Sequence, residues 1–148
     1  MPLLIKDGEK LLAIIVKNEY KKEEGVHFFT PGEYSQQIAY MHHKKGKIIK
    51  PHIHNIIVRE VKYTQEVLII KSGVLQVDFY TDSRKYIESY ILKSGDIIIL
   101  ISGGHGFKVL EELEMFEVKQ GPYMEGNDKI RFESVIEEPL FKEEDYNG

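Results

Sequence analysis

The chain of 148 residues contains no cysteine. This excludes disulfide bonds and thiolate chemistry, so a transition metal would have to be held by nitrogen and oxygen ligands. Long apolar runs are also lacking. The run Leu11 to Val16 is far too short to cross a bilayer, and no small-residue cleavage site follows it. We therefore expect a cytoplasmic protein.

Charge of one sign is not concentrated anywhere in the sequence. The formal net charge is −4, and no basic stripe collects the lysines. This balance argues against nucleic acid as a partner, and nothing points to a membrane. Hydrophobic residues make up 42% and charged residues 30%, which are ordinary values for a globular protein. We expect one domain, residues 1–148, that binds a small molecule.

No segment shows a long helical period, whereas short β-rich runs recur between turn signals such as Asp7-Gly8, Ser72-Gly73 and Ser94-Gly95. Many short strands at this spacing predict an all-β sandwich or barrel. The expected strands are Leu3 to Ile5, Leu11 to Val16, Gln36 to His43, Lys47 to His54, Glu66 to Ser72, Val74 to Tyr80, Tyr86 to Leu92, Asp96 to Ile101, Gly106 to Leu110 and Glu114 to Lys119.

The alternation within these runs predicts which faces are buried. Between Val74 and Tyr80, the apolar side chains Leu75, Val77 and Phe79 share one face, and Gln76 and Asp78 share the other. This pattern predicts a half-buried strand.

Two other runs are apolar on both faces. They are Val67 to Ile70 and Ile97 to Ile101. A strand without a polar face belongs at the centre of a structure or at a subunit contact, so we expect these two runs there.

Four side chains are candidate metal ligands. Because the side-chain period of a strand is two, His52 and His54 would point to the same face. Glu66 opens the run Val67 to Ile70, and His105 follows the run Ile97 to Ile101 through a glycine loop. Three neutral histidines and one carboxylate leave two positions of an octahedral metal open, which is typical of a reactive rather than a structural site.

A His-x-His pair by itself is common on half-exposed strands, so the order of the motifs carries the argument. Gly46-x5-His52-x-His54 is followed by Glu66-x6-Gly73 and then by Gly95-Asp96 and His105. This series resembles the cupin motifs, which implies a double-stranded β-helix, or jelly-roll barrel. The resemblance implies a core barrel over about residues 36 to 119, an N-terminal hairpin over 1–16 and a C-terminal extension over 120–148.

The sequence departs from the cupin pattern in two places. Eleven residues separate His54 from Glu66, where cupins have three or four. We interpret Ile56 to Tyr63 as an inserted loop or extended strand ends. In the second motif, Ile101 replaces a proline, His105 comes one residue early and Val109 replaces an asparagine. Glycines around His105 give this loop the freedom to compensate.

The segments Ser102 to Phe107 and Lys119 to Tyr123 resemble a subgroup of small bacterial cupins without an assigned activity. Gln120 and Tyr123 are therefore candidates for substrate-binding residues over the barrel mouth. The blander interpretation is a plain turn at Gly121-Pro122 with Tyr123 packed on the surface, and we favour it. Cupins often form homodimers through strands near their N-terminus. Leu11 to Val16 suits that contact, or simply covers its own barrel.

The resemblance implies a metalloprotein with one divalent transition metal, and nitrogen and oxygen ligands admit Fe, Mn, Ni, Co or Zn. Our main hypothesis is a metal-dependent enzyme, such as a dioxygenase, isomerase or lyase, acting on a sugar derivative or a keto or hydroxy acid. One alternative is a cupin that binds a sugar or small ligand without turnover. Another is a metal-free isomerase or epimerase of nucleotide-linked sugars that uses paired histidines, in which Glu66 matters little.

Overall fold

Every regular element of the described chain is a β-strand. The structure is a computed structural model and describes residues 1–141. The predicted all-β class is confirmed, and no helix long and apolar enough to cross a membrane occurs within these residues. The strands are β1 (Leu3–Asp7), β2 (Lys10–Val16), β3 (Gly25–Phe28), β4 (Ala39–His42), β5 (Glu66–Tyr80), β6 (Tyr86–Lys93), β7 (Ile97–Leu100) and β8 (Gly104–Lys119).

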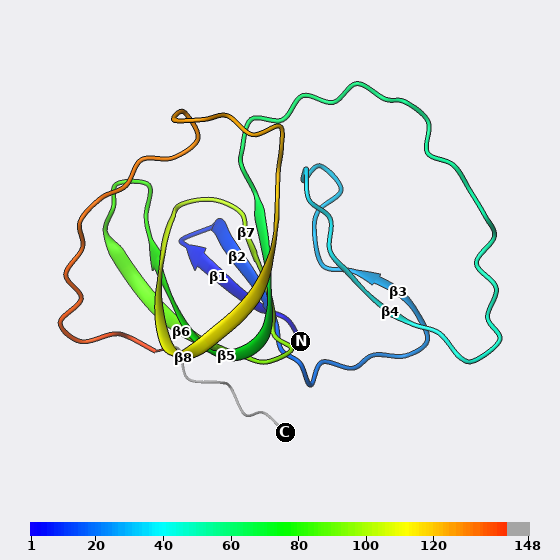
Figure 1. Ribbon diagram of the computed structural model, residues 1–148, viewed down its shortest axis with the longest axis horizontal. Helices are drawn as coiled ribbons and strands as arrows, with labels where there is room; N and C mark the ends of the chain where they lie inside the picture. Colours follow the sequence, from blue (N-terminus) through cyan, green and yellow to red (C-terminus); the bar gives the residue numbers. More distant parts are fainter. Residues whose placement is uncertain (142–148) are drawn as a thin grey trace.

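Six strands form one antiparallel sheet that curls into a half-barrel (Figure 1). Its order is β1-β2-β7-β5-β6, and β8 pairs with the other edge of β5. β7 lies beside the first half of β5, and β6 lies beside the second half. The hairpin β1–β2 belongs to this sheet because β2 pairs with β7, so the expected N-terminal hairpin is part of the half-barrel.

β5 and β8 are long, bent strands, although the sequence predicted two strands in each place. Ser72-Gly73 does not reverse the chain. It lies among three register shifts between Ile70 and Leu75, where extra residues in the ladder bend both strands. Gly73 has a φ of +93°, and a side chain there would lie 2.1 Å from the carbonyl oxygen of Glu112. The glycine therefore serves a bulge rather than a turn.

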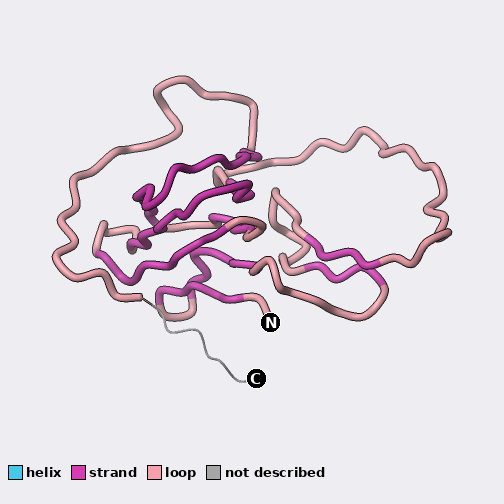
Figure 2. The backbone as a smooth tube through the Cα atoms, turned by 60° about the horizontal axis from the view of Figure 1, so that its bottom comes forward, coloured by secondary structure: helices cyan, strands magenta, loops and turns pink. Residues whose placement is uncertain are grey.

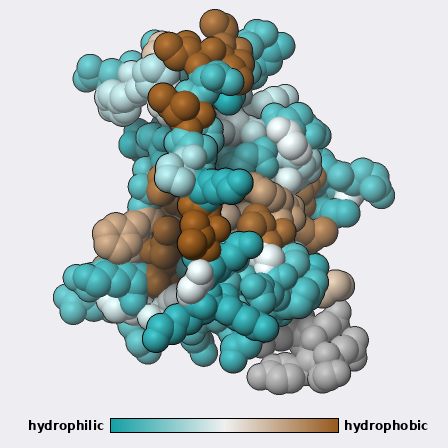
Figure 3. Space-filling view, turned by 90° about the vertical axis from the view of Figure 1, so that its right-hand side faces the viewer, coloured by the Kyte–Doolittle hydropathy of each residue, from teal (hydrophilic) through white to brown (hydrophobic). Residues whose placement is uncertain are grey.

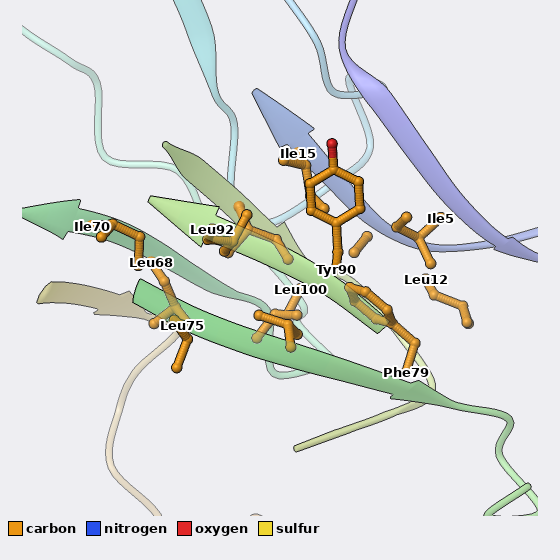
Figure 4. Close-up of a cluster of buried hydrophobic side chains, with 13 residues drawn as sticks. Ile5, Leu12, Ile15, Leu68, Ile70, Leu75, Phe79, Tyr90, Leu92 and Leu100 are labelled. Atoms are coloured by element: carbon orange, nitrogen blue, oxygen red, sulfur yellow. The ribbon is translucent and has the colours of Figure 1, made fainter. Parts of the chain in front are cut away.

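Two apolar clusters lie on opposite faces of the sheet. The larger cluster fills the concave side, where Leu68, Phe79 and Leu100 point toward one another (Figure 4). The smaller one includes Val67 and Ile99 and is covered by side chains from residues 20–38. β7 and the first half of β5 are thus buried on both faces, as the sequence predicted.

The strand with Leu75, Val77 and Phe79 is less simple than its alternation indicates. These three side chains are buried, but Gln76 and Asp78 on the other face are buried as well. The predicted half-buried strand is therefore wrong at this point.

A hydrogen-bonded polar layer explains the burial of that second face. The carboxylate of Asp78 accepts hydrogen bonds from the side chains of Gln76 and Ser89. The hydroxyl oxygens of Tyr86 and Ser89 lie 2.6 Å apart and share a hydrogen bond. Leu140 lies against one end of the layer, because its carbonyl accepts a hydrogen bond from the Ser89 amide and its amide donates one to the Tyr86 hydroxyl. Burial of these polar groups is tolerated since each has a partner.

The run Leu11 to Val16 lies inside the sheet. Residues 12–16 of β2 are buried between β1 and β7. The run therefore covers its own barrel, which was the second of the two interpretations, and it is not exposed for a subunit contact. The homodimer itself stays a prediction.

The strand predicted over Lys47 to His54 does not form. Residues 43–65, called the arm below, run as an irregular loop beyond the β3–β4 hairpin, and both views show it apart from the main sheet (Figures 1 and 2). Within residues 1–141, no backbone hydrogen bond involves residues 48–64. β3 was not among the strands expected from the sequence.

Candidate functional site

Glu66 and His105 meet at the mouth of the half-barrel. Glu66 is the first residue of β5, and His105 pairs with Phe79 near the end of β5. A straight strand of this length would hold these positions about 40 Å apart. The curl of the β5–β8 pair instead brings Glu66 Oε2 within 3.7 Å of His105 Nε2.

Both side chains are partly shielded and remain accessible. The Glu66 side chain is 14% exposed and the His105 side chain 31%. Over residues 1–141, neither side chain takes part in a hydrogen bond with another side chain or the backbone. The carboxylate and the imidazole can therefore both bind a molecule that enters the mouth.

Burial raises the pKa of the Glu66 carboxyl above its ordinary value of 4.5. The negative charge of Glu117 raises this pKa further, and Lys119 and Lys129 oppose the shift. Removing a carboxylate from water disfavours its charged form, and so does a like charge nearby. Glu66 is thus a stronger base than an exposed glutamate.

The pKa of the His105 imidazole moves the other way. Burial lowers this pKa below 6.5, and the positive charge of Lys129 lowers it further, against an opposite effect of Glu117. His105 is therefore neutral at pH 7 and presents one N–H donor and one free nitrogen.

The pair opens into a cavity of about 2120 Å³ bounded by the sheet, the end of the arm and the C-terminal segment. This is more than a small ligand needs, so such a ligand would occupy only the part near Glu66 and His105. Six aromatic rings and several charged side chains line the cavity. The rings belong to Tyr34, Tyr63, Tyr80, Phe107, Tyr123 and Phe132.

Sequence reasoning missed Glu117 and Lys119, which set the electrostatics of the pair. They lie two residues apart on β8, and their partners in the register, Leu68 and Glu66, share the inner face of the sheet. The period of two would have placed both on one face, but their partner strand was not known. Lys129 carries no such signal, since it lies in irregular chain.

Gln120 and Tyr123 both line the cavity. The side chain of Gln120 accepts a hydrogen bond of 3.0 Å from Gln36 and donates one of 2.8 Å to the carbonyl of Gly121. Tyr123 is 76% exposed, with the ammonium of Lys119 5.7 Å from its ring centroid. The side chain of Gln120 is thus already hydrogen-bonded within the protein, whereas the ring of Tyr123 is exposed at the mouth.

His52 and His54 lie on the arm and do not join Glu66 and His105. Their ring centroids are 5.3 Å apart, and both residues are exposed. Because no strand forms there, the period of two does not apply. Two predicted metal ligands therefore meet at the barrel mouth, and two lie elsewhere.

The donors placed together do not fit the four-ligand metal centre expected from the sequence. In the portion covered by residues 1–141, no three side chains of histidine, aspartate or glutamate are grouped to hold a metal ion. A pair such as Glu66 and His105 leaves most of the coordination sphere of a transition metal without protein ligands. The metal remains a prediction that solution measurements can test.

Comparisons with family models, with curated proteins and with solved structures find no match to this chain.

Proposed function

We propose that this protein is an enzyme that moves a proton on a small oxygenated metabolite, either a sugar derivative or a keto or hydroxy acid. The observation that carries the proposal is the Glu66–His105 pair, 3.7 Å apart at the barrel mouth. The pKa values of both groups are shifted by burial, as is common for acid–base residues in a cleft.

The lining of the cavity supports this substrate class. The exposed rings of Phe107 and Tyr123 offer flat apolar surfaces, while lysines and carboxylates supply hydrogen-bonding groups. A few polar groups among aromatic side chains suit a small molecule that carries both C–H faces and hydroxyl or carbonyl oxygens.

The chemistry we propose needs no oxidant or co-reactant. The Glu66 carboxylate removes a proton from the carbon next to a carbonyl, and the electron pair of that C–H bond forms an enolate. Neutral His105 donates its N–H to the enolate oxygen. Return of the proton from Glu66 to the same carbon, after exchange with water, regenerates the substrate with a solvent hydrogen. Where that carbon carries a hydroxyl group, His105 gives its proton to the enolate oxygen and takes up the hydroxyl proton, and return of the Glu66 proton to the former carbonyl carbon gives the isomer.

Deuterium incorporation tests this step directly. A panel of aldoses, ketoses, sugar phosphates and 2-keto acids is incubated with the protein in D₂O, and the loss of the C–H signal is followed by proton NMR. We expect exchange of one substrate proton by the wild-type protein and a loss of about 100-fold or more in Glu66→Gln. Glu19→Gln is the matched control, because Glu19 is exposed and is not among the residues that line the cavity.

The same experiment separates a binding protein from an enzyme. Line broadening of a panel member without exchange, unchanged in Glu66→Gln, would contradict acid–base catalysis and favour a non-catalytic binding protein. Neither binding nor exchange with any member would refute the proposed substrate class.

A metal-dependent enzyme of the cupin type is the second candidate. It is supported by the convergence of Glu66 and His105, two of the four predicted ligands, and by the curled antiparallel sheet. The full ligand set requires His52 and His54 to reach the mouth. Mass spectrometry of metals in untagged protein, beside a His52→Ala, His54→Ala double variant, decides between the candidates. About one metal per chain, lost in the variant, would favour the metalloenzyme.

A further inference from the structure

The arm, residues 43–65, is rich in exposed apolar side chains. Ile53, Ile56 and Val58 are 91%, 103% and 97% exposed. Figure 3 shows hydrophobic side chains at the surface on the side of the molecule where the arm lies. Large apolar side chains gathered at a surface in this way mark an interaction site.

Most of the arm also lacks strand partners. Within the described residues, the peptide groups of residues 48–64 form no backbone–backbone hydrogen bond, although isoleucine and valine favour strands. The sequence predicted a strand over Lys47 to His54, and the isolated chain shows none there. A neighbouring strand is the element that would resolve this conflict.

An unpaired strand edge exists elsewhere in the molecule. β8 pairs only with β5, so one edge of this 16-residue strand has no partner among the described strands. Several apolar side chains of β8 are also exposed: Val109 by 56%, Leu110 by 44%, Phe116 by 59% and Val118 by 49%. Long exposed edges of this kind pair readily with another chain.

The arm and β8 have opposite charges. The arm carries six lysine and arginine side chains and a single glutamate. β8 carries four glutamates and two lysines. The whole chain has a net charge of −4, so the positive arm is the exception, and a second copy of β8 is a complementary partner.

Pro51 is compatible with such pairing. Proline cannot donate to a ladder, so it is confined to edge strands. An arm added beyond β8 would itself become the edge strand, with Pro51 on its open side or outside the paired residues.

We propose that two copies of this chain exchange arms, the segment Ile53–Val58 of each adding a strand to the open edge of β8 in the other. Reciprocal exchange makes the interface two-fold symmetric and covers both apolar surfaces at once. The proposal does not rest on the chemistry proposed at the barrel mouth, although Ile57 of the exchanged segment lines the cavity there.

Sedimentation velocity between about 1 and 100 µM tests the dimer. We expect the wild-type protein to dimerise and Val58→Asp to weaken dimerisation by about tenfold or more, because a charge would be buried at the interface. Val135→Asp is the matched control, since Val135 is 87% exposed outside both surfaces. A wild-type protein that stays monomeric throughout, or equal effects of the two variants, would overturn the proposal.

The absence of cysteine permits a second, direct test. A Val58→Cys variant is mixed with a Val109→Cys variant that carries a mass tag, and the mixture is oxidised. We expect a disulfide between the two chains, and much less of it when Val135→Cys replaces Val58→Cys. A double Val58→Cys, Val109→Cys variant that links only within one chain would show that the arm folds onto its own β8, and would refute the exchange.

Discussion

The central strands and the arm are alike in composition and opposite in environment. Ile98 and Ile99 of β7 are both fully buried, whereas Ile56 and Val58 of the arm are exposed almost as in an extended peptide. Both segments are rich in isoleucine and valine and contain short apolar runs. Apolar content alone therefore does not decide which segment becomes core.

The difference lies in the partners of each strand. β7 is hydrogen-bonded to β2 on one side and to β5 on the other, so its peptide groups are satisfied when the side chains leave water. Within residues 1–141, residues 48–64 of the arm are paired with no strand, and burying them would leave several peptide groups without hydrogen bonds. Strand pairing and apolar burial thus occur together or not at all.

Substitution of one large side chain in each region gives the sharpest contrast. Phe79→Ala removes a ring that is 1% exposed in the main cluster and should lower the free energy of unfolding by about 3–5 kcal/mol. Ile53→Ala in the arm should change it by no more than about 0.5 kcal/mol. Urea denaturation at low protein concentration measures both. Comparable losses would show that the arm packs within the monomer.

The turn before β7 provides the next largest effect. Asp96 is 1% exposed and accepts hydrogen bonds of 2.8 Å from the amides of Asn18 and Lys93 and from the ammonium of Lys17. Asp96→Ala removes the acceptor of the two amides and the carboxylate that pairs with Lys17, and it should cost about 3 kcal/mol.

Asp82 is the matched control for Asp96, because it pairs with Lys10 at the surface and its side chain is 68% exposed. Asp82→Ala should cost less than about 1 kcal/mol. Equal losses in thermal denaturation would contradict the view that Asp96 anchors β7.

The smallest expected effect concerns pH. Because the pKa of Glu66 is raised in the folded state, folded protein binds more protons than unfolded protein between pH 4.5 and this raised pKa. As the pH rises through this window, the free energy of unfolding of the wild-type protein should therefore fall relative to that of Glu66→Gln. Above the raised pKa the difference between the two proteins should stay constant.

Chemical denaturation at a series of pH values measures this difference, with Glu60→Gln in the exposed arm as the control. A difference between wild type and Glu66→Gln that does not grow with pH would contradict burial of the carboxyl group. If the stability difference from wild type grows with pH in Glu60→Gln as well as in Glu66→Gln, the carboxyl groups of the arm and of the sheet do not differ in this respect.

Several features could be predicted from the sequence because they are local. Alternation placed Leu75, Val77 and Phe79 on a buried face, and uninterrupted apolar runs marked the two strands that are buried on both sides. The hairpin at Asp7-Gly8 follows from its turn residues. Glu66 and His105 were recognised as site residues from motif order, without any knowledge of their distance.

Other features depended on neighbours that are distant in the sequence. Gly73 looked like the end of a strand, but the register with β8 made it a bulge inside one long strand. Gln76 and Asp78 looked solvent-exposed, but both are buried, and Asp78 is hydrogen-bonded to Gln76 and to Ser89 of the neighbouring strand. The pKa of His105 is lowered first by burial and further by Lys129, which lies in chain without regular structure.

The sequence by itself determined that this is an all-β protein and which apolar runs supply its core, since alternation and turn chemistry act within a few residues. Only the tertiary structure decided that Glu66 lies beside His105 while His52 and His54 lie apart, and that one isoleucine-rich segment is core and another is arm. The physical reason is that strand pairing and sheet curvature join residues far apart in the chain, and a strand without a partner cannot bury its peptide groups.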